Sequence, residues 1–269
     1  VTSGSGVTHD DAVPTLSAVV EAVSGSGNGN NGDSLTLTIT PSEAIQTPVC
    51  TFDSGGADMA GTVTYSTSSA DHICTIAVAD GDTNGAVTFT VNFEDSAGNA
   101  GTEVTTATSG AVTIDNTHPT ASAAVLAVAG TGNGNNGDSM TLTITPSETI
   151  GTPTCTFASG GAAMAGTVTY STSSADHICT IAVADGDTNG AVTFTLDFSD
   201  SAGNAATQVT SASAGSVTID NTHPTLSAAV LAVAGTGNGN NGDALTLTIT
   251  PSETIGTPTC TFASGGAAM

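Results

Sequence analysis

The sequence contains no lysine, no arginine and no tryptophan, and aromatic residues make up only 3% of its 269 positions. With 24 aspartates and glutamates, the formal net charge is −24 at pH 7. Nucleic acids and anionic membrane surfaces are excluded as partners, because proteins bind both through cationic side chains. The carboxylates also lack ordinary salt-bridge partners, so each must be solvated, bonded by backbone N–H groups or held by a bound cation.

Long apolar runs are missing as well. No stretch reaches the roughly 18 apolar residues that a membrane span needs, and Val1 does not begin a signal-peptide pattern. We expect any secretion signal or anchor to lie outside these residues. Charged residues make up 9% of the chain and hydrophobic residues 38%, the latter in short alternating runs, so the chain is expected to fold rather than to behave as a disordered acidic tail.

The sequence repeats itself every 105 residues. The segment Gly-Asn-Gly-Asn-Asn-Gly-Asp begins at Gly27, Gly132 and Gly237. Residues 120–164 and 225–269 differ only at Ala121/Leu226, Ser139/Ala244 and Met140/Leu245. Such a period is typical of arrays of similar domains, and a tailored active site would not be copied this uniformly.

The repeat divides the chain into four segments. Residues 1–11 are expected to end a preceding repeat, and residues 12–116 and 117–221 to form two complete repeats. Residues 222–269 then correspond to the first half of a third repeat. A joint is predicted at residues 115–119, Asp-Asn-Thr-His-Pro, where proline and the residue before it favour a short, stiff linker.

Within each repeat, apolar and polar residues alternate as in half-buried β-strands. Met140, Leu142 and Ile144 should face one way and the threonines between them the other. The run from Val192 to Phe198 alternates in the same way, and further strand candidates are residues 121–129, 153–157, 166–170, 177–184 and 207–219. About seven strands per repeat, with no helical period, predict an all-β fold of tandem immunoglobulin-like antiparallel sandwiches in a linear array.

Five cysteines recur at two fixed places in the repeat. Cys155 shares a strand face with Phe157, and Cys179 shares one with Ile181, so both thiols should point into the core. We predict the disulfides Cys50–Cys74 and Cys155–Cys179, with two buried free thiols as the alternative. Cys260 would pair with a cysteine after Met269. Disulfides of this kind indicate an oxidising, extracellular setting.

The motifs also resemble a known family. The order of residues 31–43 (Asn-Gly-Asp-Ser-Leu-Thr-Leu-Thr-Ile-Thr-Pro-Ser-Glu), then Asp-Ser-Ala-Gly-Asn at residues 95–99 and a Val-Thr-Ile-Asp linker, is similar to bacterial Ig-like tandem repeats of giant surface adhesins. The resemblance covers the whole chain. It implies an extender that holds a binding tip away from the cell, with calcium near the domain joints.

One motif has the spacing of calcium ligands. Asp-Gly-Asp-Thr-Asn-Gly occurs at residues 80–85 and 185–190, like the start of an EF-hand loop. The candidate ligands are Asp80, Asp82, Asn84, Asp185, Asp187 and Asn189. The twelfth position holds Val91 or Leu196 in place of glutamate, so the loop is not an EF-hand, and a polar turn between two strands is the alternative.

A second expectation places calcium at the joints. In an immunoglobulin-like sandwich the loops at one end face those of the next domain, so the first joint should gather carboxylates from both sides. The candidates there are Asp33, Asp80, Asp82, linker Asp115, Glu148 and Asp200. With no basic residue nearby, a divalent cation would relieve their repulsion and stiffen the joint.

Other chemistry has little support. The histidines are not clustered as a transition-metal site requires, and no Gly-x-Ser-x-Gly elbow or phosphate-binding lysine is present, so the chain is not expected to be an enzyme. Threonine rows such as Thr36, Thr38 and Thr40 are typical of solvated strand faces. O-linked sugars or a flat ligand-binding or ice-binding face are the alternatives for these rows.

The sequence therefore predicts the structural repeat region of an extracellular stalk or filament, located at the cell surface or on an appendage. Its expected partners are adjacent repeats of the same chain, with identical chains in a filament as a further candidate. The alternative is an adhesin whose repeats themselves bind glycan, ice or another cell, although the scarcity of aromatic residues argues against sugar-stacking platforms.

Overall fold

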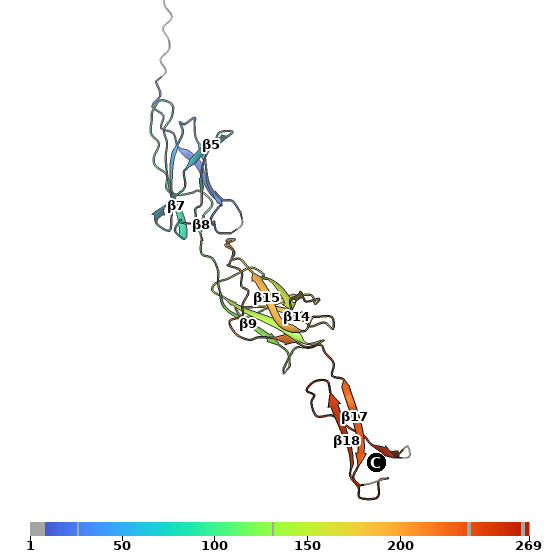
Figure 1. Cartoon of the computed structure of the whole chain (residues 1–269). Helices are drawn as coiled ribbons and strands as arrows, with labels where there is room; N and C mark the ends of the chain where they lie inside the picture. Colours follow the sequence, from blue (N-terminus) through green and yellow to red (C-terminus); the bar gives the residue numbers. More distant parts are fainter. Residues whose placement is uncertain (1–8, 26, 131, 236–237, 265–266, 269) are drawn as a thin grey trace, which may run out of the picture.

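The alternating sequence forms β-strands in each of the described repeats. A computed structural model describes residues 9–25, 27–130, 132–235, 238–264 and 267–268, and this part of the chain contains strands, turns and irregular segments with no helix. It accordingly offers no helix long and apolar enough to span a membrane. Figure 1 shows two sandwiches and a final hairpin following one another in an extended row.

The first repeat is a sandwich of two four-stranded antiparallel sheets. One sheet has the order β1-β2-β6-β5 and the other β4-β3-β7-β8. This is the ABED and CFG arrangement of immunoglobulin-like sandwiches, with a short extra strand beside the third. The strands are β1 (Leu16–Val23), β2 (Ser34–Pro41), β3 (Val49–Ser54), β4 (Ala57–Asp58), β5 (Thr64–Ser68), β6 (Asp71–Ala77), β7 (Gly85–Asn92) and β8 (Thr113–Ile114).

The second repeat has the same topology. Its sheets have the orders β13-β14-β10-β9 and β12-β11-β15-β16. The strands are β9 (Ala121–Val128), β10 (Ser139–Pro146), β11 (Thr154–Ser159), β12 (Ala162–Ala163), β13 (Thr169–Ser173), β14 (Asp176–Ala182), β15 (Gly190–Asp197) and β16 (Thr218–Ile219). The predicted all-β, immunoglobulin-like fold is confirmed.

The two sheets of each sandwich meet through the apolar faces of their strands. Met140, Leu142 and Ile144 are fully buried, as their alternation with threonine predicts. Phe157 lies opposite Phe194 across β11 and β15, and both rings belong to the same core. Burial of these side chains is the main force that holds each sandwich together.

A disulfide joins the two sheets in each repeat. Cys50–Cys74 links β3 to β6, and Cys155–Cys179 links β11 to β14, each across a separation of 24 residues. Both predicted bonds are therefore present. They connect the third and sixth strands, whereas antibody domains join the second strand to the strand equivalent to β7.

The prediction of one strand over residues 207–219 was wrong. Only β16 is a strand there. The segment first pairs with β15 through a bridge from Val209 to Leu196, then crosses to the other sheet and runs parallel to β9. Gly215, with a φ of 78°, allows this close approach, because a methyl group on it would collide with the Leu126 carbonyl oxygen. The path switches between two sheets, so a single alternating strand cannot follow it.

The final described segment is a two-stranded hairpin, β17 (Leu226–Val233) with β18 (Leu245–Pro251), followed by β19 (Ala263–Ser264) and β20 (Ala267–Ala268). Leu231 is exposed, whereas its counterpart Leu126 is buried in the second repeat. The hairpin therefore presents the face that β9 and β10 bury against their partner sheet.

Candidate functional site

The linker between the two sandwiches is held by the turn that precedes β7. The side-chain amide of Asn84 donates to the Thr117 hydroxyl at 2.6 Å and to Asp115 Oδ1 at 3.2 Å, while its oxygen accepts from the Asn116 N–H at 2.8 Å. Asn116 in turn donates to the carbonyl oxygen of Ala79 at 3.0 Å. The linker is thus fastened to the end of the first sandwich, and the same bonds recur at Asn189 and Asn221.

In the motif with calcium-like spacing, several of the candidate ligand atoms already take part in hydrogen bonds. Asp82 is buried, and its two carboxylate oxygens accept from the N–H groups of Ala60 and Ala79, each at 2.8 Å. Asp187 is bonded in the same way. Asp80 and Asp185 point to solvent. The side chains at alternate positions of this motif therefore differ in their surroundings: Asp80 is exposed to solvent, Asp82 is bonded within the turn, and Asn84 is bonded to the linker.

Three carboxylates meet on the other side of the joint. Asp115 comes from the linker, Glu148 from the β10–β11 loop and Asp200 from the segment after β15, and their oxygens lie within 4.8 Å of one another. We call these residues the carboxylate trio. The other three carboxylates expected at this joint, those of Asp33, Asp80 and Asp82, are not part of the carboxylate trio. Asp33 instead accepts from the Asn30 N–H and the Ser24 hydroxyl in the β1–β2 loop.

Two members of the trio differ in how their charge is stabilised. Asp200 is buried, and its oxygens accept from the N–H groups of Gly203 and Asn204 and from the Asn204 side-chain amide. Burial raises the pKa of the Glu148 carboxyl, and the negative charges of Asp115 and Asp200 raise it further. Because the pKa of Glu148 is raised in the folded chain, the stability that this residue contributes is fully present at a pH below the ordinary glutamate pKa. It is lost as the pH rises through the raised pKa.

The same arrangement occurs at the start of the first repeat. Asp10, Glu43 and Asp95 form a second trio, which was not among the predicted site residues. The signal was available, since each residue lies one 105-residue period before Asp115, Glu148 or Asp200. The Asn99 side chain lowers the pKa of Asp95, with burial opposing this and the N–H groups of residues 97–99 reinforcing it.

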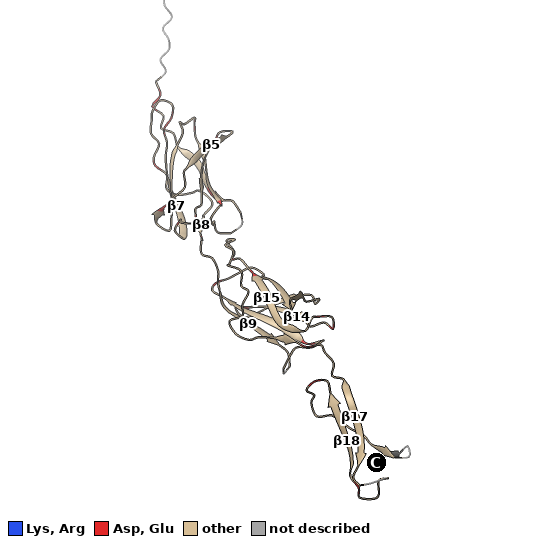
Figure 2. Ribbon diagram, in the orientation of Figure 1, with Lys and Arg blue, Asp and Glu red and all other residues tan. Residues whose placement is uncertain are grey.

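Such an arrangement suits a hard divalent cation, because carboxylate oxygens are the ligands that calcium prefers. The chain has no lysine or arginine to neutralise the trios (Figure 2). The ion pair that the described residues do contain, His9 with Asp11, does not include a member of either trio.

The histidines make local hydrogen bonds. His72 and His177 each bond through Nδ1 to a tyrosine hydroxyl, of Tyr65 and Tyr170 respectively, at 2.7 Å. His118, in the linker, lies with its Nδ1 2.8 Å from the carbonyl oxygen of Ala205 in the second sandwich. The sequence did not indicate this contact between the linker and the sandwich that follows it.

Replacing Asn84 by alanine is expected to loosen the first joint alone. The variant loses both donors to the linker and the acceptor for Asn116, at a cost of about 1–2 kcal/mol. Hydrogen exchange should become faster at residues 115–117, while the amides of β2 and β7 keep their protection. Asn189→Ala is the matched control and should act only at residues 220–222. Equal exchange at residues 115–117 in N84A and the unchanged chain would contradict the expected clamp.

Comparisons with known proteins returned solved structures of tandem immunoglobulin domains at low sequence identity. No protein-family model and no curated protein sequence matches the chain. A titin I-band fragment is 11% identical over 95% of this chain and 86% of its own length, with a TM-score of 0.43. Tandem Ig repeats of Dlar are 14% identical over 75% of this chain and 97% of theirs, with a TM-score of 0.23. At these values the likeness carries no argument about activity or partners.

Proposed function

We propose that this chain is the structural repeat region of an extracellular stalk or filament, of the kind found in giant surface adhesins, and that calcium stiffens its joints. The observation that carries the proposal is the trio of Asp115, Glu148 and Asp200, drawn from the linker and from two loops of the next sandwich. A cation bound there would tie the linker to that sandwich and relieve the repulsion of three close charges.

The fold supports a mechanical role. In a row of similar domains each unit contacts mainly its neighbours, so length grows with the number of repeats. The disulfides in both sandwiches resist unfolding of each unit and persist in oxidising surroundings, which favours an extracellular location. Adjacent repeats are the partners that this role requires, and identical chains could add lateral contacts.

Binding by the repeats themselves has weaker support. A sugar-stacking surface needs exposed aromatic faces. The chain has only two tyrosines and no tryptophan, and both tyrosine hydroxyls already bond to histidine. We therefore do not propose sugar recognition by the described repeats.

Calcium should lengthen and stabilise the chain. Adding millimolar calcium to the chelator-treated protein is expected to raise the free energy of unfolding of the second sandwich by about 1–2 kcal/mol, for a site with the weak affinity of extracellular modules. The unfolding midpoint of that sandwich should rise accordingly. Small-angle scattering should show a longer, stiffer particle. The effect should shrink in acid, because protons compete with calcium for the carboxylates.

Matched variants locate the effect. Glu148→Gln removes one charge from the trio and should abolish the response of the first joint, whereas Glu43→Gln alters only the trio before the first repeat. Magnesium and a matched concentration of sodium chloride control for general screening. If calcium changes neither the midpoint nor the length, the joints are not cation-stiffened and the proposal fails.

A further inference from the structure

One strand at the side of each sandwich is open to solvent along its outer edge. Strand β5 ends the sheet order β1-β2-β6-β5 (Figure 1), and β13 ends the corresponding sheet of the second repeat. All five residues of each strand are exposed, and no described segment pairs with their outer edges. Because alternate residues of an edge strand direct their N–H and C=O groups outward, each strand offers a row of unpaired backbone groups.

The other edges of the two sandwiches are covered or short. At the edge of β1, the Thr108 N–H donates to the Val19 carbonyl oxygen, and the Glu21 N–H donates to that of Ser109. Residues 213–214 cover β9 in the same way. Strands β4, β8, β12 and β16 have two residues each. In the described sandwiches, β5 and β13 are therefore the long edges that remain open.

Strands β5 and β13 also lack the features that usually prevent edge pairing. Both have the sequence Thr-Tyr-Ser-Thr-Ser, and their register with the neighbouring strand is regular. Natural sheets normally protect an open edge with charges, proline or a bulge. Since these edges carry no charge, two copies of a chain with a net charge of −24 can meet here without placing carboxylates opposite each other.

Both tyrosines of the chain lie on these two edges. Tyr65 is 39% exposed and Tyr170 is 40% exposed, whereas the phenylalanines of both sandwiches are buried. Each tyrosine hydroxyl bonds to a histidine of the neighbouring strand, so the ring is already held in place. An exposed, ordered tyrosine is typical of the side chains that anchor protein interfaces, because its burial adds a large contact area at little loss of conformational freedom.

The two repeats differ elsewhere but not along these edges. Leu126 replaces the buried Glu21, and Thr154 replaces Val49, which is exposed on the other sheet. Strands β5 and β13 are identical although every position is exposed. Because exposed positions ordinarily tolerate substitution, this identity favours a contact that both edges make.

We infer that β5 and β13 are lateral docking edges for a second copy of this chain, which binds by antiparallel strand pairing. In the symmetric register, Ser66 lies opposite its own counterpart and Tyr65 lies opposite Thr67, so hydroxyl-bearing side chains meet across the pair. The inference goes beyond the proposed function, because it identifies a partner outside the chain and does not depend on calcium.

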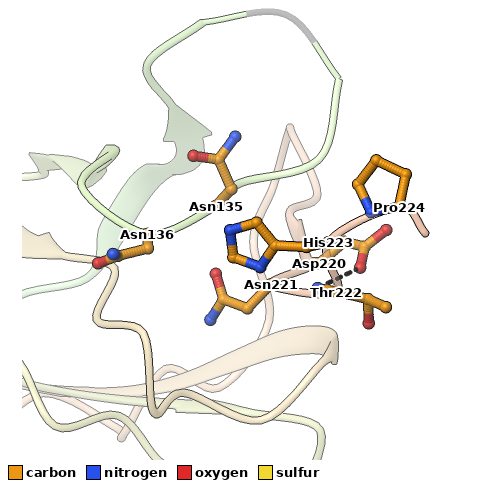
Figure 3. Close-up of a pocket in the computed structure, with 7 residues that line it drawn as sticks. All are labelled: Asn135, Asn136, Asp220, Asn221, Thr222, His223 and Pro224. Atoms are coloured by element: carbon orange, nitrogen blue, oxygen red, sulfur yellow. Dashed lines mark hydrogen bonds between the residues drawn. The ribbon is translucent and has the colours of Figure 1, made fainter. Parts of the chain in front are cut away.

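The joints leave these edges free. The second linker, residues 220–224, lies beside Asn135 and Asn136 of the β9–β10 loop (Figure 3), and the Thr222 N–H donates to Asp220 Oδ1 at 3.1 Å. The hydrogen bonds of the described linkers involve the turns before β7 and β15 and the following sandwich, and none involves β5 or β13. Lateral pairing can therefore occur without disturbing the joints.

A single edge gives a weak contact. A five-residue strand is about 17 Å long, so its pairing buries far less than the roughly 1,000 Å² of a stable interface. Each chain offers two such edges, and a second contact between chains that are already joined costs less than the first. Association should therefore strengthen with the number of repeats, as a filament requires.

Sedimentation equilibrium tests the association. Every sample contains chelator and carries Cys260→Ser, because Cys260 is an exposed free thiol that could join chains by itself. The apparent mass should rise with concentration above that of one chain, and more strongly as salt screens the net charge. A chain that stays monomeric up to about 1 mM at high salt would overturn the inference.

Matched variants locate the contact. Ser66→Glu with Ser171→Glu places like charges opposite each other and should weaken association about tenfold. Val49→Glu with Thr154→Glu adds the same charge to the exposed face of the other sheet and should have little effect. Unchanged unfolding midpoints show that both variants fold. Equal weakening by both pairs would contradict docking at the edges.

Hydrogen exchange identifies the paired strands directly. As the concentration rises, exchange should slow at residues 64–68 and 169–173, whereas residues 16–23 in the covered strand β1 should not change. Association without this slowing, as through the exposed hairpin β17–β18, would overturn the inference. Slowing by an unrelated extended peptide but not by the chain itself would assign the edge to another protein and overturn it as well.

Discussion

Replacing Glu21 by leucine is expected to stabilise the first sandwich by about 2 kcal/mol at neutral pH, because the change removes a poorly solvated carboxylate from the core and adds apolar contacts. Glu21 lies in β1 and is only 6% exposed, and its Oε1 is buried without a hydrogen-bond partner. The counterpart in the second repeat is Leu126, which packs in that sandwich's core. The second sandwich thus already has leucine at the position equivalent to Glu21, and the fold accommodates it.

The effect should depend on pH with a definite sign. Burial raises the pKa of Glu21, and the backbone of Val112 offsets part of the rise. An acid whose pKa is raised by folding contributes most stability below its ordinary value, and this stability is lost as the pH rises through the folded value. The unchanged first sandwich should therefore weaken toward neutral pH, and E21L should remove that part of its pH dependence.

Each complete sandwich carries one tyrosine, which makes the measurement selective. Tyr170→Phe leaves Tyr65 as the fluorescent reporter of the first sandwich, and Tyr65→Phe leaves Tyr170 for the second. A gain of 2 kcal/mol corresponds to a midpoint shift of roughly 10 °C in a domain of this size. The converse variant, Leu126→Glu, should destabilise only the second sandwich. A lower midpoint for E21L would contradict the expected cost of the buried carboxyl.

Removing the disulfide of the first sandwich is expected to have the opposite and larger effect. The double substitution Cys50→Ala and Cys74→Ala frees a loop of 24 residues, and the restored chain entropy of the unfolded state should lower stability by about 3 kcal/mol. The midpoint reported by Tyr65 should fall by roughly 15 °C. Substituting Cys155 and Cys179 should do the same to the second sandwich.

The two sandwiches also control for each other in this experiment. Because neighbouring units interact mainly at the joint, loss of one disulfide should leave the other sandwich's midpoint nearly unchanged. A reducing agent should destabilise both sandwiches of the unaltered chain together and should not affect a chain that lacks both disulfides. An unchanged midpoint after reduction would show that the disulfides do not stabilise the fold.

Alternation was sufficient to predict the strands that face a single core. Leu35, Leu37 and Ile39 alternate with threonines and are fully buried, and the cysteines share faces with core residues and form the expected bonds. Alternation failed at residues 207–219, because that segment leaves one sheet for the other before it returns at β16.

The carboxylates show a different limit. A motif such as residues 80–85 records spacing along the chain, but it does not record which hydrogen bonds the oxygens make. Asp82 accepts from the N–H groups of nearby Ala79 and of distant Ala60, and Asn84 bonds to the linker, so some of these oxygens are engaged by partners more than 20 residues away. The expectation of calcium ligands in that loop stays a prediction.

The repeat, the all-β fold and the cysteine pairs follow from local pattern, because side-chain alternation and a fixed period report directly which face of each strand is buried. The joint depends on positions that are distant in sequence. The sequence placed Asp115, Glu148 and Asp200 at the joint together with three other carboxylates, but the fold decided that these three meet, because the linker, the β10–β11 loop and the segment after β15 come together there. Alternation along single strands reports burial and does not report how loops distant in sequence meet.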